Sequence, residues 1–128
     1  MARCLERVRT RVPATAAELA NDIDRQDIVS VNLQRAVQLA ADVAAHLLAS
    51  RDRPPADSMG GAFTALAQED VIEPELATVF RRAVGFRNIA VHAYQALDWE
   101  IVFEIATERL GDFERFAAAA LRAVDAEA

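Results

Sequence analysis

The stretch IVSVNLQRAVQLAADVAAHLLAS, Ile28 to Ser50, has helical periodicity, because its apolar residues recur three and four positions apart. Among its larger apolar side chains are Val31, Leu33, Val37, Leu39, Val43, Leu47 and Leu48. They cover a surface too wide for one amphipathic helix with a solvent-facing side, so we expect this helix to be central in an all-α domain. Its most apolar part, AVQLAADVAAHLLA (Ala36 to Ala49), is interrupted by Asp42 and His46 and falls short of the roughly 20 apolar residues that span a bilayer, so no transmembrane helix is predicted.

The sequence before this central helix predicts a short basic helix from Ala2 to Arg11, which ends ahead of Pro13. Thr15 and Glu18 form a capping-box pattern, Thr-x-x-Glu, which marks a new helix start. The central helix therefore begins near Thr15 or, after a break within residues 21–27, near Asp27.

The sequence after the central helix begins with a loop, Arg51 to Asp57, that contains two adjacent prolines. Helices are expected at about Ser58–Gln68, Pro74–Val91 and Asp98–Val124. The last of these would contain Gly111 at a cost of about 1 kcal/mol. With no strand pattern and only short connections, the chain predicts one domain over residues 1–128, an up-and-down bundle of four to five helices.

Composition narrows the possible functions. The formal net charge is −6, so no global basic field attracts nucleic acid or an anionic membrane, and any polyanion must be bound locally. Cys4 is the single cysteine, which allows no internal disulfide, and the charged N-terminal residues do not resemble a secretory signal. We therefore expect a cytoplasmic protein.

The stretch GFRNIAVHAYQ, Gly85 to Gln95, places polar and ionisable residues in an apolar helix. The apolar stripe of this helix continues onto Arg87, and a guanidinium there is costly unless an anion, a partner subunit or a solvated cleft receives it. Asn88 and His92 are four residues apart and hence neighbours, whereas Arg87 and His92 are about 140° apart on an ideal helix. They would converge only at a frayed helix end or across a two-fold dimer.

Each of these residues also has an ordinary structural explanation. Arg87 can pair with an acidic residue of the last helix, such as Glu100 or Glu104, and His92 suits the negative C-terminal end of its helix. Tyr94 can be a connector aromatic with its hydroxyl in water, and Asp42 a buried hydrogen-bond acceptor. No ligand pair among Cys4, His46 and His92 has zinc-type spacing, so we expect no metal and no cofactor.

The run GFRNIAVHAY, with Arg87, four residues, His92, one residue and Tyr94, resembles the motif of HEPN-domain toxins of the HepT type. Further resemblances follow in the family's order along most of the chain. They are NLQRA (Asn32 to Ala36), Asp42, the proline-containing loop, FTAL (Phe63 to Leu66) and the aspartate-led final helix. The motif also carries Asn88 and the preceding VGF in register, which makes the match more specific than a bare Arg-x4-His pattern.

The resemblance implies a metal-independent endoribonuclease that acts as a homodimer. It also implies a type VII toxin–antitoxin system, with a minimal nucleotidyltransferase antitoxin as partner and RNA as substrate. By carry-over, Arg87 and His92 are the catalytic residues, and Tyr94 is where the antitoxin attaches AMP to neutralise the toxin. Asn88 and Asp42 are supporting candidates.

The chemistry of these side chains agrees with that assignment. RNA carries its own nucleophile, so cleavage requires a base, an acid and positive charge on the phosphorane. His92 can exchange protons near neutral pH, and Arg87 can grip two phosphate oxygens. Asn88, one turn before His92, would orient the imidazole ring. Two alternatives stay open: a non-catalytic helical dimer that docks a nucleotidyltransferase, and a helical protein that binds a nucleotide phosphate through Arg87.

Overall fold

The computed structural model describes residues 1–127, and in that range it contains seven α-helices, one short 3-10 helix and no strand. The α-helices are α1 (Ala2–Arg11), α2 (Ala16–Ala20), α3 (Ile23–Ala49), α4 (Met59–Gln68), α5 (Pro74–His92), α6 (Trp99–Glu108) and α7 (Leu110–Glu127), and the 3-10 helix is η1 (Tyr94–Ala96). The all-α class is therefore confirmed, with more helices than the four to five expected.

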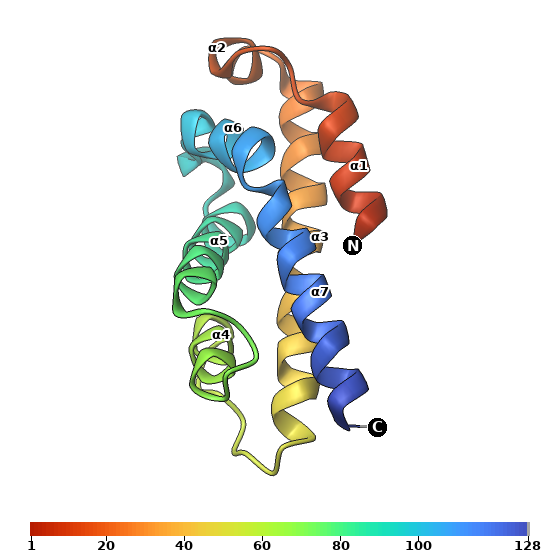
Figure 1. Ribbon diagram of the computed structural model, residues 1–128. Coiled ribbons are helices and arrows are strands. Elements are labelled where there is room, and N and C mark those ends of the chain that lie inside the picture. The colour runs from red at the N-terminus through yellow and green to blue at the C-terminus, as the bar shows by residue number, and fades with distance from the viewer. Residues whose placement is uncertain (128) are drawn as a thin grey trace.

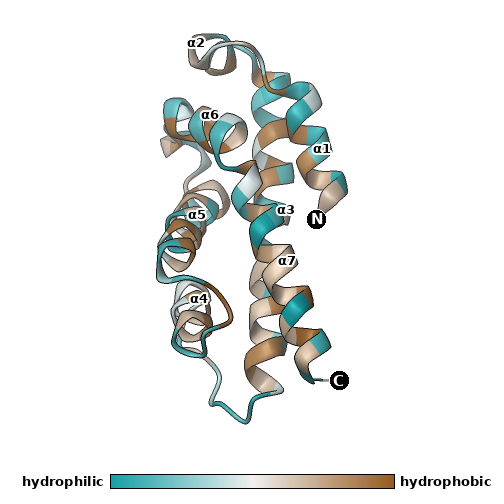
Figure 2. Ribbon diagram, in the orientation of Figure 1, coloured by the Kyte–Doolittle hydropathy of each residue, from teal (hydrophilic) through white to brown (hydrophobic). Residues whose placement is uncertain are grey.

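The helix α3 is central, as its apolar width predicts. It runs the length of the molecule and contacts α1, α4, α5 and α7 (Figure 1). Leu33, Val37, Leu47 and Leu48 are buried in one continuous core. In contrast, the connection from α3 to α4 is coloured hydrophilic in Figure 2, in agreement with the loop predicted at 51–57. No helix within residues 1–127 is long and apolar enough to cross a membrane.

Phenylalanine rings hold α4, α5 and α7 together beside α3. Phe63 stacks on Phe80 with ring centroids 4.8 Å apart, and Phe116 lies 5.0 Å from Phe80 and 5.6 Å from Phe63. Phe113 meets Phe80 edge-on at 5.1 Å. Such offset and edge-on pairs are favourable beyond the area that they bury, so this cluster fixes α5, and with it the motif at the end of α5.

Local capping explains why the predicted helix starts are largely correct. Thr15 accepts a hydrogen bond from the Glu18 backbone N–H at 3.1 Å, and Ser58 accepts one from the Gly61 N–H at 3.0 Å. The Glu18 carboxylate accepts from the backbone N–H of Ala14 instead of that of Thr15, so the capping box closes one residue earlier than expected. These bonds depend on neighbours in sequence, which is why sequence patterns reveal them.

The central helix begins earlier than the Asp27 start considered above. A separate short helix, α2, follows Thr15, and Asp22 then caps α3 by accepting from the Arg25 backbone N–H at 3.1 Å. The break is thus confined to residues 21–22. Residues 23–27, expected within a break, form the first turn and a half of α3.

The expectation of one long final helix from Asp98 to Val124 is wrong. The helix breaks at Arg109, whose φ of −111° and ψ of 1° end α6, and α7 begins at Leu110. α6 packs on α2, whereas α7 packs on α3 and α5, and Figure 1 shows the two helices pointing in different directions. The partners on each side of the break therefore decide it, and Gly111 lies in the first turn of α7 and not inside a continuous helix.

Candidate functional site

Arg87 is half-buried and lies in the last turns of α5. Its Nη2 donates to Oε1 of Gln38 on α3 at 3.2 Å, and its Nη1 donates to Oδ1 of Asn88 at 3.3 Å. Both acceptors are neutral amides. The expected alternative of an ion pair with Glu100 or Glu104 is wrong, because no carboxylate within residues 1–127 lies at ion-pair distance from Arg87 and Glu104 pairs with Arg109.

Asp42 joins Arg87 through one intervening side chain. Nε2 of Gln38 donates to Oδ1 of Asp42 at 2.9 Å, while the Oε1 of the same amide accepts from Arg87. The carboxylate thereby fixes which way the Gln38 amide points, and so keeps its oxygen toward the guanidinium. The structural alternative of a buried Asp42 is wrong, since this side chain is exposed.

His92 is the last residue of α5, and its side chain is exposed. The helix stays regular to this point, and Ala93 ends it with φ −151° and ψ 54°. A frayed helix end therefore does not bring His92 round toward Arg87, and an ideal helix keeps the two about 140° apart. The Oδ1 of Asn88 accepts a hydrogen bond from Arg87, so in this structure the Asn88 oxygen supports the guanidinium.

Tyr94 opens the 3-10 helix η1 and turns its hydroxyl toward α3. The hydroxyl donates to Oδ1 of Asp27 at 2.8 Å, and the buried Ser30 hydroxyl donates to the tyrosine oxygen at 3.4 Å. Trp99 packs edge-on against the ring at 5.8 Å. Tyr94 is thus a partly exposed residue of the connection whose phenol is also hydrogen-bonded to the central helix.

The surroundings of Tyr94 raise its pKa from the ordinary value of 10.0. Burial is the largest cause, and the hydrogen bond from Ser30 opposes it. The hydrogen bond to Asp27 and the negative charge of that carboxylate add to the increase. The phenol is consequently neutral over the physiological range and donates its proton toward Asp27.

Sequence reasoning missed Asp27, Ser30 and Gln38. Asp27, Gln38 and Asp42 fall within about 60° of one another around an ideal helix, so the helical spacing offered a signal that they share a face. Nothing in the local sequence indicates that α5 and η1 come to that face. The bonds to Tyr94 and Arg87 span 67 and 49 residues.

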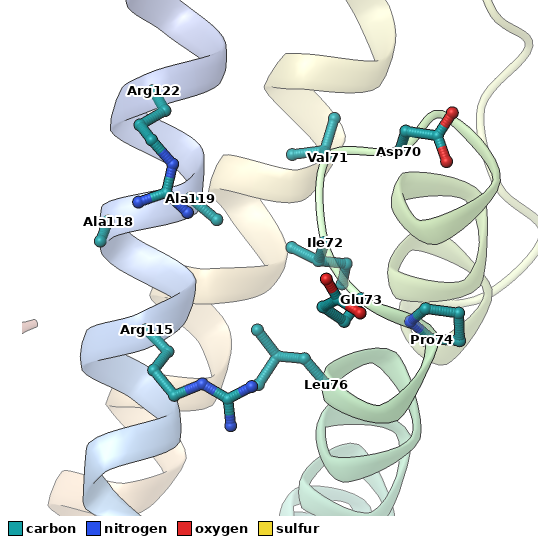
Figure 3. A pocket seen from close by; sticks show the side chains of 10 residues that line it. All are labelled: Asp70, Val71, Ile72, Glu73, Pro74, Leu76, Arg115, Ala118, Ala119 and Arg122. Atoms are coloured by element: carbon teal, nitrogen blue, oxygen red, sulfur yellow. The ribbon is translucent and has the colours of Figure 1, made fainter.

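One hollow in the structure lies away from the motif. A cavity of about 550 Å³ separates α7 from the segment at 70–74, and Figure 3 shows Arg115 and Arg122 on one side with Glu73 on the other. His46 is exposed in the last turn of α3, and Cys4 is a half-buried free thiol. Within residues 1–127, no three His, Cys, Asp or Glu side chains are grouped as a metal-ligand set.

An all-helical domain in which α5 and η1, with Arg87, His92 and Tyr94, are held against the central α3 resembles the HEPN toxins of known structure. A family model for HepT-like ribonucleases matches residues 1–120. The chain is also 36% identical over 114 residues to the mRNA nuclease HepT of Shewanella oneidensis, covering 89% of this chain and 85% of that protein. The chain therefore belongs to the HepT-like ribonuclease family.

Solved structures agree with this assignment. A toxin–antitoxin crystal structure with AMP-PNP superposes with a TM-score of 0.85 at 33% identity, covering 92% of this chain and 89% of that chain. A tri-AMPylated Shewanella oneidensis HEPN toxin in complex with an MNT antitoxin gives a TM-score of 0.84 at 35% identity, covering 92% and 88%. The resemblance expected from the motif is thus confirmed at the level of family and fold.

Proposed function

We propose that this chain is a cytoplasmic endoribonuclease toxin, one HEPN-like domain that cuts RNA in the cleft of a homodimer without a metal ion. Arg87 and His92 carry the cleavage, with Asn88 and Asp42 in support. A minimal nucleotidyltransferase antitoxin neutralises the toxin by transferring AMP to Tyr94. Family membership and the names of the relatives support this proposal: one is an mRNA nuclease, and another is an AMPylated toxin bound to its antitoxin.

The observation that carries the proposal is the environment of Arg87. A half-buried guanidinium would ordinarily be matched by a carboxylate, yet its two partners are amide oxygens of Gln38 and Asn88. These partners orient the guanidinium without cancelling its charge. It can therefore bind two nonbridging oxygens of a phosphodiester and stabilise the charge that develops in the transition state.

The reaction uses the 2′-hydroxyl of RNA as the nucleophile. A base removes its proton as the oxygen attacks phosphorus, and an acid protonates the departing 5′-oxygen, which leaves a cyclic phosphate and a free 5′-hydroxyl. Each subunit offers one exposed histidine in this region, His92. Two subunits facing one cleft would supply both the base and the acid.

Two features of the structure favour a dimer. Arg87 and His92 diverge on a regular helix, so a second copy is needed to bring an arginine and both histidines to one phosphate. In addition, α3 exposes Leu39 and Val43, which are 40% and 38% accessible, and α5 exposes Ile89 and Val91. Apolar side chains exposed on the two helices that carry the site suit a subunit interface.

The position of Tyr94 suits control by modification. Transfer of AMP replaces the hydroxyl proton that Asp27 accepts with a negatively charged phosphodiester. The modified side chain then repels Asp27 and adds bulk two residues from His92. Either effect would obstruct the approach of an RNA backbone to the cleft.

The test combines mass spectrometry with RNA cleavage. The chain is expressed alone and with its nucleotidyltransferase and ATP, and intact mass and peptide mapping locate any AMP. We expect AMP on Tyr94 only when the partner is present, with cleavage lost in the modified sample and insensitive to EDTA in the unmodified one. Tyr94→Phe should accept no AMP and continue to cut RNA.

His92→Ala separates the enzyme from a non-catalytic docking module. The enzyme proposal expects loss of cleavage and of growth inhibition, while dimer formation and partner binding persist. An unmodified wild-type chain that binds the nucleotidyltransferase but leaves RNA intact would replace the proposal with the docking module. Cleavage that EDTA abolishes would contradict the metal-independent mechanism alone.

A further inference from the structure

A charged groove lies between α1 and α3, apart from the residues assigned above to cleavage. Its volume is about 730 Å³, and its lining includes Arg3 and Arg7 from α1, Arg35 from α3, and Asp27, Val31 and Asn32. All three arginines are exposed. Arg3 and Arg7 are four residues apart, which places them side by side on α1, about 6 Å apart along its axis.

The arginines of this groove differ from most others in the chain. Six arginines elsewhere have a carboxylate at ion-pair distance, namely Arg9, Arg25, Arg51, Arg53, Arg109 and Arg115. Across residues 1–127, none of Arg3, Arg7 and Arg35 has one. Arg11, Arg81, Arg82, Arg87 and Arg122 also lack such a partner within residues 1–127, but in this groove three unpaired arginines share one lining.

The groove borders the same face of α3 that receives the motif. Asp27, Arg35 and Gln38 lie within about 80° of one another around an ideal helix. Tyr94 binds Asp27, and Arg87 binds Gln38. Arg35 therefore lies between these two contacts along α3. The arginines of α1 flank one side of this face, while α5 and η1 flank the other.

We infer that the groove between α1 and α3 binds the phosphodiester backbone of single-stranded RNA where the strand extends beyond the cleavage site. This inference rests on the proposed ribonuclease function. Guanidinium groups grip phosphates in bidentate fashion, and several of them along one groove suit a chain of evenly spaced charges. The net charge of −6 repels a polyanion such as RNA, so RNA binding needs a local positive site, and this groove supplies one.

The experiment compares two triple variants that remove the same charge. The groove variant is R3Q/R7Q/R35Q, and the matched control is R11Q/R81Q/R122Q, whose positions are exposed, have no ion-pair partner within residues 1–127 and do not line the groove. Affinity is measured for a single-stranded 2′-O-methyl RNA, which lacks the nucleophile and cannot be cut, at several salt concentrations. Affinity falls as salt rises, and each phosphate contact that a variant loses makes the slope of log affinity against log salt shallower by about 0.7 for a single strand.

We expect the groove variant to bind the RNA at least tenfold more weakly, with a salt slope smaller by about 2, and the control to stay within about threefold of wild type. Cleavage of a long RNA should show a raised KM. Cleavage of a dinucleotide, which has a single phosphodiester and no flanking phosphates, should keep its kcat/KM.

Equal losses in the two variants would overturn the inference, because net charge alone would then explain them. It would also be overturned if only the groove variant lost its dimer or its nucleotidyltransferase, since the groove would then contact protein. Wild-type chain that cuts neither substrate would instead refute the proposed function. Wild-type chain that cuts long RNA, together with a groove variant that binds and cuts it equally well, would refute the groove alone.

Discussion

Asp27→Asn tests whether the central helix controls the phenol of Tyr94. The carboxylate of Asp27 accepts the tyrosine proton at 2.8 Å, and its hydrogen bond and negative charge both help to raise the tyrosine pKa. An asparagine keeps an acceptor oxygen but removes the charge. We therefore expect the pKa of Tyr94 to fall relative to wild type, while burial continues to raise it above the ordinary value.

The same change weakens folding. A hydrogen bond to a charged group contributes more than a neutral one, and the difference at this partly exposed site is about 0.5–1 kcal/mol. For a chain of this size, that loss lowers Tm by about 2–4 °C at neutral pH. Because the folded pKa of Tyr94 lies above the unfolded one, the contribution of this group to wild-type stability is fully present below pH 10.0 and is lost as pH rises through the folded pKa. The variant should lose stability less steeply in that window.

Tyrosinate absorbance during a pH titration gives a direct assay, because Tyr94 is the single tyrosine of the chain. Asp125→Asn, on the exposed side of α7, is the control with the same change in charge. The reasoning is refuted if Asp27→Asn leaves the tyrosine pKa unchanged or raises it, or if Asp125→Asn lowers it equally.

Three further predictions concern cleavage and stability. Arg87→Lys keeps the charge but loses the planar two-nitrogen grip, so kcat for RNA cleavage should fall about 100-fold, and near-normal kcat would contradict the role of the guanidinium. Phe80→Ala removes a buried ring from the aromatic cluster and should cost about 3–5 kcal/mol in denaturant unfolding, against less than about 0.5 for the exposed Ile101→Ala. Gly85 lies inside α5, and a Cβ added there has nothing within 4 Å, so Gly85→Ala should stabilise the protein by about 0.5–1 kcal/mol. In Gly61→Ala the added Cβ meets the Ser58 hydroxyl at 3.0 Å, so this variant should not be stabilised. A lower Tm for Gly85→Ala would count against this account.

Much of the fold follows from sequence because helix boundaries are set by neighbours along the chain. Pro74 starts α5 and Ser58 caps α4, and both helices lie where these residues predict. The failure at Arg109 has the opposite origin. Residues 98–124 have continuous helical periodicity, but α6 and α7 bury their apolar sides against different partners, and a straight helix cannot reach both.

The wide apolar surface of α3 likewise predicts that this helix is central, but it does not predict which of its side chains are buried. Leu33 and Val37 are buried as expected, while Val31, Leu39 and Val43 remain accessible on the outer face. A single helix pattern cannot distinguish the side that meets the core from a side that is left for another subunit, because both are apolar.

The sequence by itself determined the helical class, the residues that form the Arg-x4-His-x-Tyr motif, and the family to which they point. Those features are local or depend on residue identity, so spacing reveals them. Only the tertiary structure decided what the motif touches: Tyr94 binds Asp27, Arg87 binds Gln38, and Arg35 meets Arg3 and Arg7 across a groove. Each of these pairings joins residues far apart in the chain, and their encounter depends on how α1, α3 and α5 pack, which no stretch of sequence encodes alone.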